Sequence, residues 1–123
     1  MEADTRLYHN PRCSKSRAAL ELLRERGIEP QIVAYLDDPP TAAELRRLVS
    51  MTGSGVHDLL RQGEAEYSAL KLSEASSDDD LITAMAQHPR LIERPLFVHA
   101  GRAVVGRPPE RVLELLDEEA SPG

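Results

Sequence analysis

The sequence predicts a single α/β domain, residues 1–123, in which helices cover a four-stranded mixed sheet. Three observations support this prediction. A strand, a helix and a second strand follow one another near the start of the chain, helical segments occupy the middle, and two strands around a tight turn precede a last helix. The order β-α-β, helices, β-β-α places strands from both ends of the chain in one sheet.

The first strand, helix and strand form a predicted βαβ unit. Thr5–His9 is short and ends at an Asn-Pro turn, which predicts a strand. Ser14–Arg26 predicts a helix that Gly27 ends, and its apolar residues recur at helical spacing: Ala18, Ala19, Leu22 and Leu23. Gln31–Leu36 predicts the second strand, which a right-handed crossover places parallel to the first.

The middle of the chain predicts helices with polar caps. Thr41 opens a T-x-x-E capping box, and Gly53 ends the helix that follows. Ser77 caps a later helix whose first turn is acidic, which suits the positive end of the helix dipole, and Pro89 closes it. A short helical piece, Val56–Arg61, lies between the two helices.

The C-terminal part of the chain predicts a hairpin and a helix. Leu96–His99 and Ala103–Val105 flank a turn that contains Gly101, so they are expected to pair as neighbouring strands. Arg107–Pro109 then opens the last helix. Asp117–Gly123 is interpreted as a frayed acidic tail.

Composition and charge exclude several classes of protein. A formal net charge of -6 repels phosphate backbones, and 3% aromatic residues without Trp leave little surface for stacking on bases, so no nucleic acid is expected. No apolar run approaches the roughly 20 residues of a membrane helix, and the polar N-terminus lacks a signal-peptide core. One Cys excludes an internal disulfide. These features predict a cytoplasmic protein.

Cys13, the only cysteine, is the main candidate for chemistry. It lies between a predicted strand and the start of a predicted helix, where free backbone N–H groups and the helix dipole stabilise a thiolate or bind an oxyanion. Its surroundings carry no acid from Thr5 to Leu20, and several residues there are basic: Arg6, Arg12, Lys15 and Arg17. The alternative is a buried structural cysteine, although these charged neighbours suit it poorly.

Other candidate residues are ambiguous from spacing alone. His9 either caps the strand or the turn, or has a supporting role in which it holds the loop or adjusts the Cys13 thiolate through a hydrogen bond. The remaining histidines show no metal-ligand spacing with Cys13, so we predict no metal site. Pro95 is most simply an ordinary proline before a strand. Arg61 and Arg107 would ordinarily be solvated surface side chains.

Taken together, several motifs resemble the glutaredoxin-linked arsenate reductase family of the thioredoxin-like superfamily, in particular its short chromosomal branch. The resemblance runs in the same order from about Leu7 to Leu116. The combination of H-N-P-x-C with R-P and G-R-P is much more specific than any one motif. The matching segments are 9–17, 35–36 with 39–41, 59–61, 88–95 and 106–108.

The resemblance implies a thioredoxin-like fold with a helical insertion at about 41–88 and a cis peptide at Arg94–Pro95. It implies that Cys13 attacks arsenate while Arg61, Arg94 and Arg107 hold the oxyanion. Five further residues are assigned supporting positions: His9, Asn10, Ser14, Ser16 and Pro95. No cofactor is expected to be bound. Because one Cys cannot complete a two-electron reduction, glutathione is the expected co-substrate and glutaredoxin the expected partner of a monomeric enzyme.

Two other functions stay open. The related Spx-type proteins bind RNA polymerase, and many of them use a C-x-x-C redox switch. The matching pair here is Cys13 and Ser16, so such a switch within the chain is excluded, although binding is not. A glutathione-linked thiol transferase is the other alternative, but it would not require three arginines.

Overall fold

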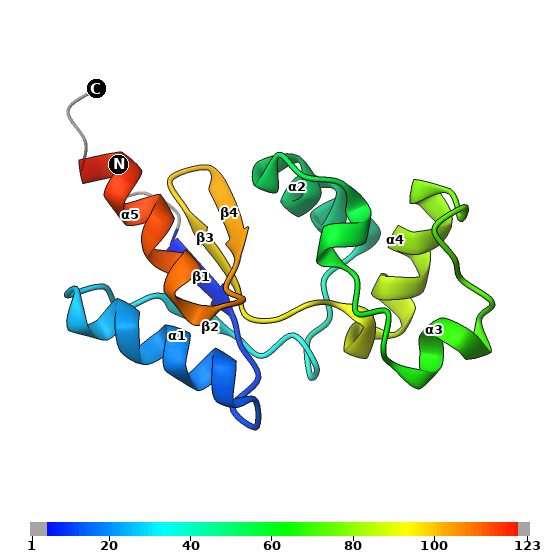
Figure 1. Ribbon diagram of the computed structural model, residues 1–123, viewed down its shortest axis with the longest axis horizontal. Helices are drawn as coiled ribbons and strands as arrows, with labels where there is room; N and C mark the ends of the chain where they lie inside the picture. Colours follow the sequence, from blue (N-terminus) through cyan, green and yellow to red (C-terminus); the bar gives the residue numbers. More distant parts are fainter. Residues whose placement is uncertain (1–4, 121–123) are drawn as a thin grey trace. The chain divides into compact units, whose positions relative to one another are not determined.

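Four short strands form one mixed sheet in the order β2-β1-β3-β4. The computed structural model describes residues 5–120, with side chains up to Leu116. The strands are β1 (Thr5–Tyr8), β2 (Gln31–Val33), β3 (Leu96–His99) and β4 (Arg102–Val105). The N-terminal β1 and the C-terminal β3 lie at the centre of the sheet, so both ends of the chain contribute to it as the element order predicts (Figure 1).

The pairing within the sheet is mixed. β1 and β2 are parallel, and helix α1 (Ser14–Glu25) connects them as the crossover of a βαβ unit. β3 runs antiparallel to both β1 and β4. In this register Leu7 of β1 lies opposite Ile32 on one side and Phe97 on the other. The predicted fold class, with a four-stranded mixed sheet and a parallel β1–β2 pair, is therefore confirmed.

The hydrophobic core on one face of the sheet joins strands to helices. Its strand residues alternate with residues that point to the other face, as a pleated strand requires: Leu7, Phe97 and Val104. Its helical residues come from α1, from the 3-10 helix η3 (Pro109–Val112) and from α5 (Leu113–Ala120): Ala19, Leu23, Val112, Leu115 and Leu116. Figure 1 shows α1 and α5 on this face.

A two-residue turn joins β3 to β4. Ala100 and Gly101 both have positive φ, at 53° and 81°. Two such residues form the type of turn whose twist matches that of the flanking strands. Gly101 adopts this conformation without steric cost, whereas Ala100 does so only because the hairpin requires it. The predicted hairpin is confirmed.

Residues Tyr35–Glu93 form a compact helical unit, while the sheet unit comprises the described parts of Met1–Ala34 and Arg94–Gly123. The helical unit contains α2 (Ala42–Thr52), η1 (Val56–Leu59), α3 (Ala65–Ala69), α4 (Asp78–Gln87) and η2 (Pro89–Leu91). Helix α2 packs against α4. The core of the helical unit is formed by buried, non-aromatic side chains: Leu45, Leu48, Leu59, Leu81, Met85 and Leu91.

The predicted helix boundaries of this unit are confirmed by their caps. The Thr41 hydroxyl accepts a hydrogen bond from the backbone N–H of Glu44 at 3.1 Å, and Ser77 accepts one from Asp80 at 3.1 Å. Gly53 ends α2 with a φ of 70°, the left-handed conformation that a glycine cap supplies. These signals act within one turn of helix, which is why the sequence alone reveals them.

Several predicted boundaries differ from the structure. The strand expected over Gln31–Leu36 stops at Val33, because the chain turns at Tyr35, whose side chain is fully buried. The tail expected to fray over Asp117–Gly123 instead continues α5 to Ala120, and residues 121–123 lie outside the described part. Helices α3 and η2 were not anticipated. No helix within residues 5–120 combines the length and apolar character needed to cross a membrane.

Candidate active site

Cys13 is the N-cap residue of α1. Its backbone is extended, with φ −95° and ψ 121°, and its carbonyl accepts a hydrogen bond from the N–H of Arg17 at 3.0 Å. Its own N–H donates to the Asn10 carbonyl at 3.0 Å, which closes the turn before the helix. The half-buried thiol makes no capping hydrogen bond. The sulfur therefore lies at the positive end of the helix without serving to cap it.

A hydrogen-bond network holds the loop that precedes Cys13. His9 Nδ1 and the Ser16 hydroxyl are 2.6 Å apart and both side chains are buried. The Asn10 N–H donates to the same hydroxyl at 3.1 Å, and the Asn10 side-chain oxygen accepts from the N–H of Arg12 at 3.0 Å. Because Ser16 lies in the first turn of α1, these bonds fix the loop to the helix that carries Cys13.

The surroundings of His9 favour the uncharged form of its imidazole. Its burial lowers the pKa of the imidazole below the ordinary 6.5, and the positive charges of Arg24 and Arg17 lower it further. Within residues 5–120 no hydrogen bond joins His9 to the thiol, so its structural contact is with Ser16. Sequence reasoning placed His9 near the cysteine but did not identify Ser16 as its partner.

The lowered pKa of His9 predicts a loss of stability in mild acid. Well above pH 6.5 the ring is predominantly neutral in both the folded and the unfolded chain. As the pH falls, the unfolded chain binds the proton first, so the free energy of unfolding decreases until the folded ring is also protonated. Urea unfolding of the wild type and of His9→Gln from pH 8 to pH 5 measures this effect. The difference between the two curves should shrink toward acid, and two parallel curves would contradict the prediction.

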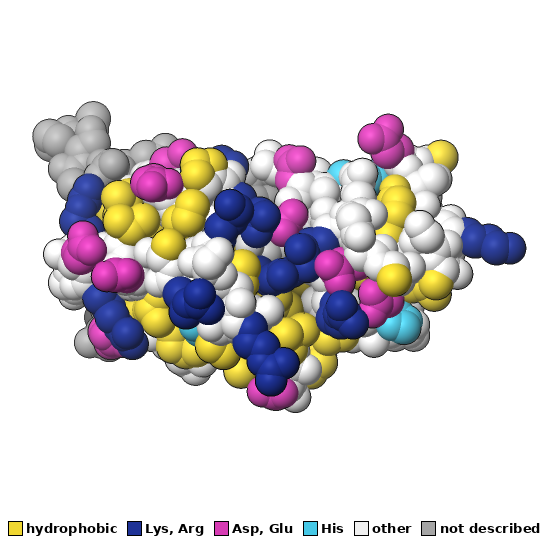
Figure 2. All heavy atoms as spheres, turned by 60° about the horizontal axis from the view of Figure 1, so that its bottom comes forward, with side chains coloured by type: hydrophobic (Ala, Val, Ile, Leu, Met, Phe, Trp, Pro, Cys, Tyr) yellow, Lys and Arg dark blue, Asp and Glu magenta, His cyan; other side chains and the backbone are white. Residues whose placement is uncertain are grey.

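Exposed basic side chains surround the first turn of α1. Arg12, Lys15 and Arg17 are exposed, and Arg17 Nη1 donates to the Pro11 carbonyl at 2.8 Å. Ser14, the first residue of the helix, is also exposed. Basic and acidic side chains are interspersed on the face shown in Figure 2. The sequence around Cys13 nevertheless remains locally basic in a chain of net charge -6.

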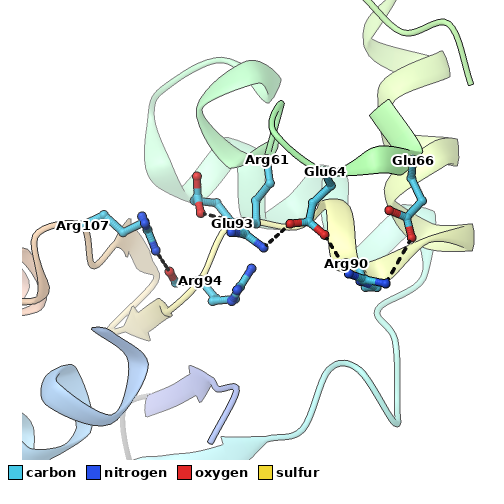
Figure 3. A network of polar contacts seen from close by, with 7 residues as sticks. All are labelled: Arg61, Glu64, Glu66, Arg90, Glu93, Arg94 and Arg107. Atoms are coloured by element: carbon cyan, nitrogen blue, oxygen red, sulfur yellow. Dashed lines mark hydrogen bonds and ion pairs between the residues drawn. The ribbon is translucent and has the colours of Figure 1, made fainter. Parts of the chain in front are cut away.

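Two arginine-proline segments meet in the sheet unit. The peptides Arg94–Pro95 and Arg107–Pro108 are both cis, which confirms the expectation for the first, whereas the second was not foreseen. The Gly106 N–H donates to the Pro95 carbonyl at 2.8 Å, and Arg107 Nη1 donates to the Arg94 carbonyl at 3.2 Å (Figure 3). The structure thus brings together the R-P and G-R-P motifs.

Gly106 is required by this close approach. A Cβ at this position would lie 2.9 Å from Pro95 Cγ and 3.0 Å from Val112 Cγ1, which is closer than such carbons normally pack. The proline ring is rigid and Val112 is fully buried, so neither neighbour moves aside easily. The glycine of the G-R-P motif therefore has a packing reason that spacing alone did not show.

Arg94 is partly buried and its guanidinium is not fully paired. Its Nε is buried and has no hydrogen-bond partner among residues 5–120. A buried donor without an acceptor costs about 1–3 kcal/mol. Such a donor therefore usually marks a place where water or a ligand binds. No hydrogen bond joins Arg94 or Arg107 to the Cys13 thiol in the described part of the chain.

Arg61 belongs to the helical unit and is not a solvated surface side chain. Only 23% of its side chain is exposed. Its Nη1 lies 2.8 Å from Glu64 Oε2, and its Nε lies 3.4 Å from Glu93 Oε1 (Figure 3). Sequence reasoning missed both carboxylates. The i,i+3 spacing of Arg61 and Glu64 is a signal that could have identified the first of them.

Among the described residues there is no group of three or more His, Cys, Asp or Glu side chains that could hold a metal ion.

The sheet order, the thiol at the N-terminal end of α1 and the buried cis-proline before β3 define a protein of the thioredoxin-like class. The ArsC family model matches residues 8–115, and the chain belongs to the ArsC family.

Relatives and solved structures agree with this membership. The uncharacterized protein YfgD of Escherichia coli K12 is 48% identical over 118 residues, which cover 94% of this chain and 99% of that protein. An arsenate reductase of Neisseria meningitidis is 44% identical over 115 residues, covering 92% and 98%. The structure of an arsenate reductase from Vibrio cholerae superposes with a TM-score of 0.87 at 47% identity, covering 93% of this chain and 98% of that one.

Proposed function

We propose that this protein is an arsenate reductase in which Cys13 is the nucleophile. The observation that carries the proposal is the position of Cys13 at the N-cap of α1, where its thiol makes no capping bond. The helix dipole and the free N–H groups of the first turn favour both a thiolate and a bound oxyanion at this place. Relatives with this architecture that are named arsenate reductases support the assignment.

Arginine side chains would hold the oxyanion. Arg94 carries a buried Nε without an acceptor, which an oxyanion oxygen would satisfy. Arg107 is tied to the Arg94 backbone, so the two guanidinium groups belong to one local structure. Arg61 is the third proposed ligand. Guanidinium groups stay charged and donate hydrogen bonds in a planar fork, which suits a tetrahedral anion. Their positive charge also offsets the negative charge that develops as the thiolate attacks arsenate.

The proposed reaction uses two thiols for each arsenate. The Cys13 thiolate attacks arsenic(V), a sulfur–arsenic bond forms, and one arsenate oxygen leaves as water after it takes up protons. An external thiol then completes the reduction: arsenic gains two electrons, and two thiols are oxidised to one disulfide. Because Cys13 is the only cysteine, glutathione is the proposed co-substrate and glutaredoxin the proposed partner that returns Cys13 to the thiol.

The remaining site residues would position the nucleophile. His9, Asn10 and Ser16 hold the loop that leads to Cys13 through their shared hydrogen bonds. Pro95 contributes its carbonyl to the Gly106 N–H and thereby joins the two arginine-bearing segments. Ser14 begins the helix and contributes one of its free N–H groups.

The test is arsenate-dependent NADPH oxidation in the presence of glutathione, glutaredoxin and glutathione reductase. Arg94→Ala should raise the KM for arsenate about tenfold or more, because an anion ligand that donates charged hydrogen bonds is lost. Arg46→Ala, which removes an exposed arginine paired with Asp79 on α4, is the control and should leave the KM unchanged.

A second substrate separates arsenate reduction from thiol transfer. Reduction of a neutral disulfide by the same protein should not depend on Arg94, since that substrate carries no oxyanion. If the wild type reduces the disulfide but not arsenate, the thiol-transferase alternative is correct. If it reduces neither and co-purifies with RNA polymerase, the regulatory alternative is correct.

A further inference from the structure

A chain of alternating charges runs through the helical unit. Glu93, Arg61, Glu64, Arg90 and Glu66 follow one another in space, as Figure 3 shows. Glu64 bridges the two arginines, with Oε2 at 2.8 Å from Arg61 Nη1 and Oε1 at 3.2 Å from Arg90 Nη2. Glu66 reaches only the outer arginine, at 3.9 Å. Arg61 is thus held from two sides by carboxylates.

The backbone places Arg61 beside Glu93. Leu60 and Ile92 form an isolated antiparallel bridge. On its two sides the Arg61 N–H donates to the Leu91 carbonyl at 2.7 Å, and the Glu93 N–H donates to the Leu59 carbonyl at 2.7 Å. These bonds align the two chain segments independently of the side chains. The approach of Glu93 to Arg61 is therefore built into the fold of the helical unit.

The two carboxylates leave one nitrogen of the Arg61 guanidinium, Nη2, without a hydrogen bond among residues 5–120. Nη1 donates a hydrogen bond to Glu64 Oε2, and Nε forms an ion pair with Glu93 Oε1 at 3.4 Å without a hydrogen bond, whereas Nη2 donates no hydrogen bond in this part of the chain. A guanidinium group is planar and rigid, so contacts at two of its nitrogens determine the direction of the third. Both carboxylates are themselves shielded, with only 17% of the Glu64 and 21% of the Glu93 side chain exposed.

We propose that Glu64 and Glu93 are positioning residues that hold the Arg61 guanidinium so that Nη2 stays available for the oxyanion. This inference rests on the proposed function, because it takes Arg61 as an oxyanion ligand. Ordering the long arginine side chain in advance removes an entropy cost that binding would otherwise include. The carboxylates act through Arg61 and do not touch the substrate.

Positioning and charge predict opposite results. A carboxylate beside an oxyanion site repels the anion, so if its charge were its main effect, removing it would strengthen arsenate binding. If orientation is its main effect, removing the Glu64 carboxylate, which accepts a hydrogen bond from Arg61, weakens binding, and glutamine, which keeps an acceptor oxygen without the charge, restores it. Comparing Ala and Gln at the same position therefore distinguishes the two.

The experiment measures arsenate binding as protection of Cys13 from alkylation, which needs neither glutathione nor glutaredoxin. Glu64→Ala and Glu93→Ala should each raise the Kd for arsenate about tenfold, and Glu64→Gln should keep it within about threefold of wild type. Glu66→Ala, a member of the same charge chain that does not contact Arg61, is the matched control and should leave the Kd unchanged. In an Arg61→Ala background, Glu64→Ala should have no further effect.

The outcomes separate this inference from the proposed function. If the wild type shows no arsenate protection, or if Arg61→Ala binds arsenate as well as wild type, the oxyanion role of Arg61 is wrong and the inference fails with it. If Arg61→Ala weakens binding but both alanine variants at the carboxylates bind normally or more tightly, only the inference is overturned. Thermal unfolding identifies a variant that does not fold. Because the two carboxylates approach Arg61 from different segments, either folded alanine variant is sufficient to test the positioning role.

Discussion

Cys13→Ser is expected to lower arsenate reduction by about a thousandfold or more, because a hydroxyl at neutral pH is a far weaker nucleophile than a thiolate. The substitution changes one atom and leaves the arginines in place. The same variant should still bind arsenate, since the helix N-terminus and the guanidinium groups remain. The measurements are the coupled assay of arsenate reduction and the binding of arsenate to the variant by calorimetry.

Unfolding measurements test whether this loss of activity is chemical and not a loss of folding. The Cys13 thiol makes no capping hydrogen bond, and serine is a preferred N-cap residue, so Cys13→Ser should unfold at the same temperature as wild type or be up to about 1 kcal/mol more stable. Ser14→Cys in the Cys13→Ser background is the control, because it moves the thiol one residue along the helix and should not restore activity. Appreciable reduction of arsenate by Cys13→Ser alone would refute the role of the sulfur.

Phe97→Ala is expected to destabilise the fold by about 3–5 kcal/mol. Phe97 is fully buried at the centre of the sheet, with Leu7 opposite it on β1 and Val104 opposite it on β4. Its ring also stacks on His99 at a centroid distance of 5.8 Å. Truncation leaves a cavity against both strands and the helices that pack on them. Urea or guanidinium unfolding followed by circular dichroism measures the change.

Ile32→Ala is the matched control for this loss. Ile32 lies opposite Leu7 on the other side of β1, but it is 41% exposed on the edge strand β2. A large part of its surface remains in water after folding, so its truncation should cost only about 1 kcal/mol, well below the cost at Phe97. Equal effects of the two substitutions would show that the core does not centre on Phe97.

The fold was predictable where the determining signals are local. The T-x-x-E box at Thr41, the serine cap at Ser77 and the glycine stop at Gly53 act over a few neighbouring residues, and each lies where the sequence placed it. The predicted length of strand β2 is too great, because the burial of Tyr35 overrides the strand propensity of the residues before it. Helix α3 has no buried residue, so it carries no apolar pattern that could predict it.

The candidate site was predictable only in part. The placement of Cys13 at a helix N-terminus follows from a strand, an Asn-Pro turn and a helix in succession. The contact of His9 with Ser16 depends on the loop folding back on the first turn of the helix, which spacing did not specify. From spacing alone Arg61 was expected to be solvated, and its burial between two carboxylates depends on the bridge between Leu60 and Ile92.

By itself the sequence determined the order of the elements, their caps and the single thiol at the start of a helix, because hydrophobic spacing and capping bonds operate within one element. Only the tertiary structure decided that Gly106 packs on Pro95, that Arg107 binds the Arg94 carbonyl and that Glu93 lies beside Arg61. These pairs come from different segments, and their contacts arise when strand pairing and helix packing bring the segments together.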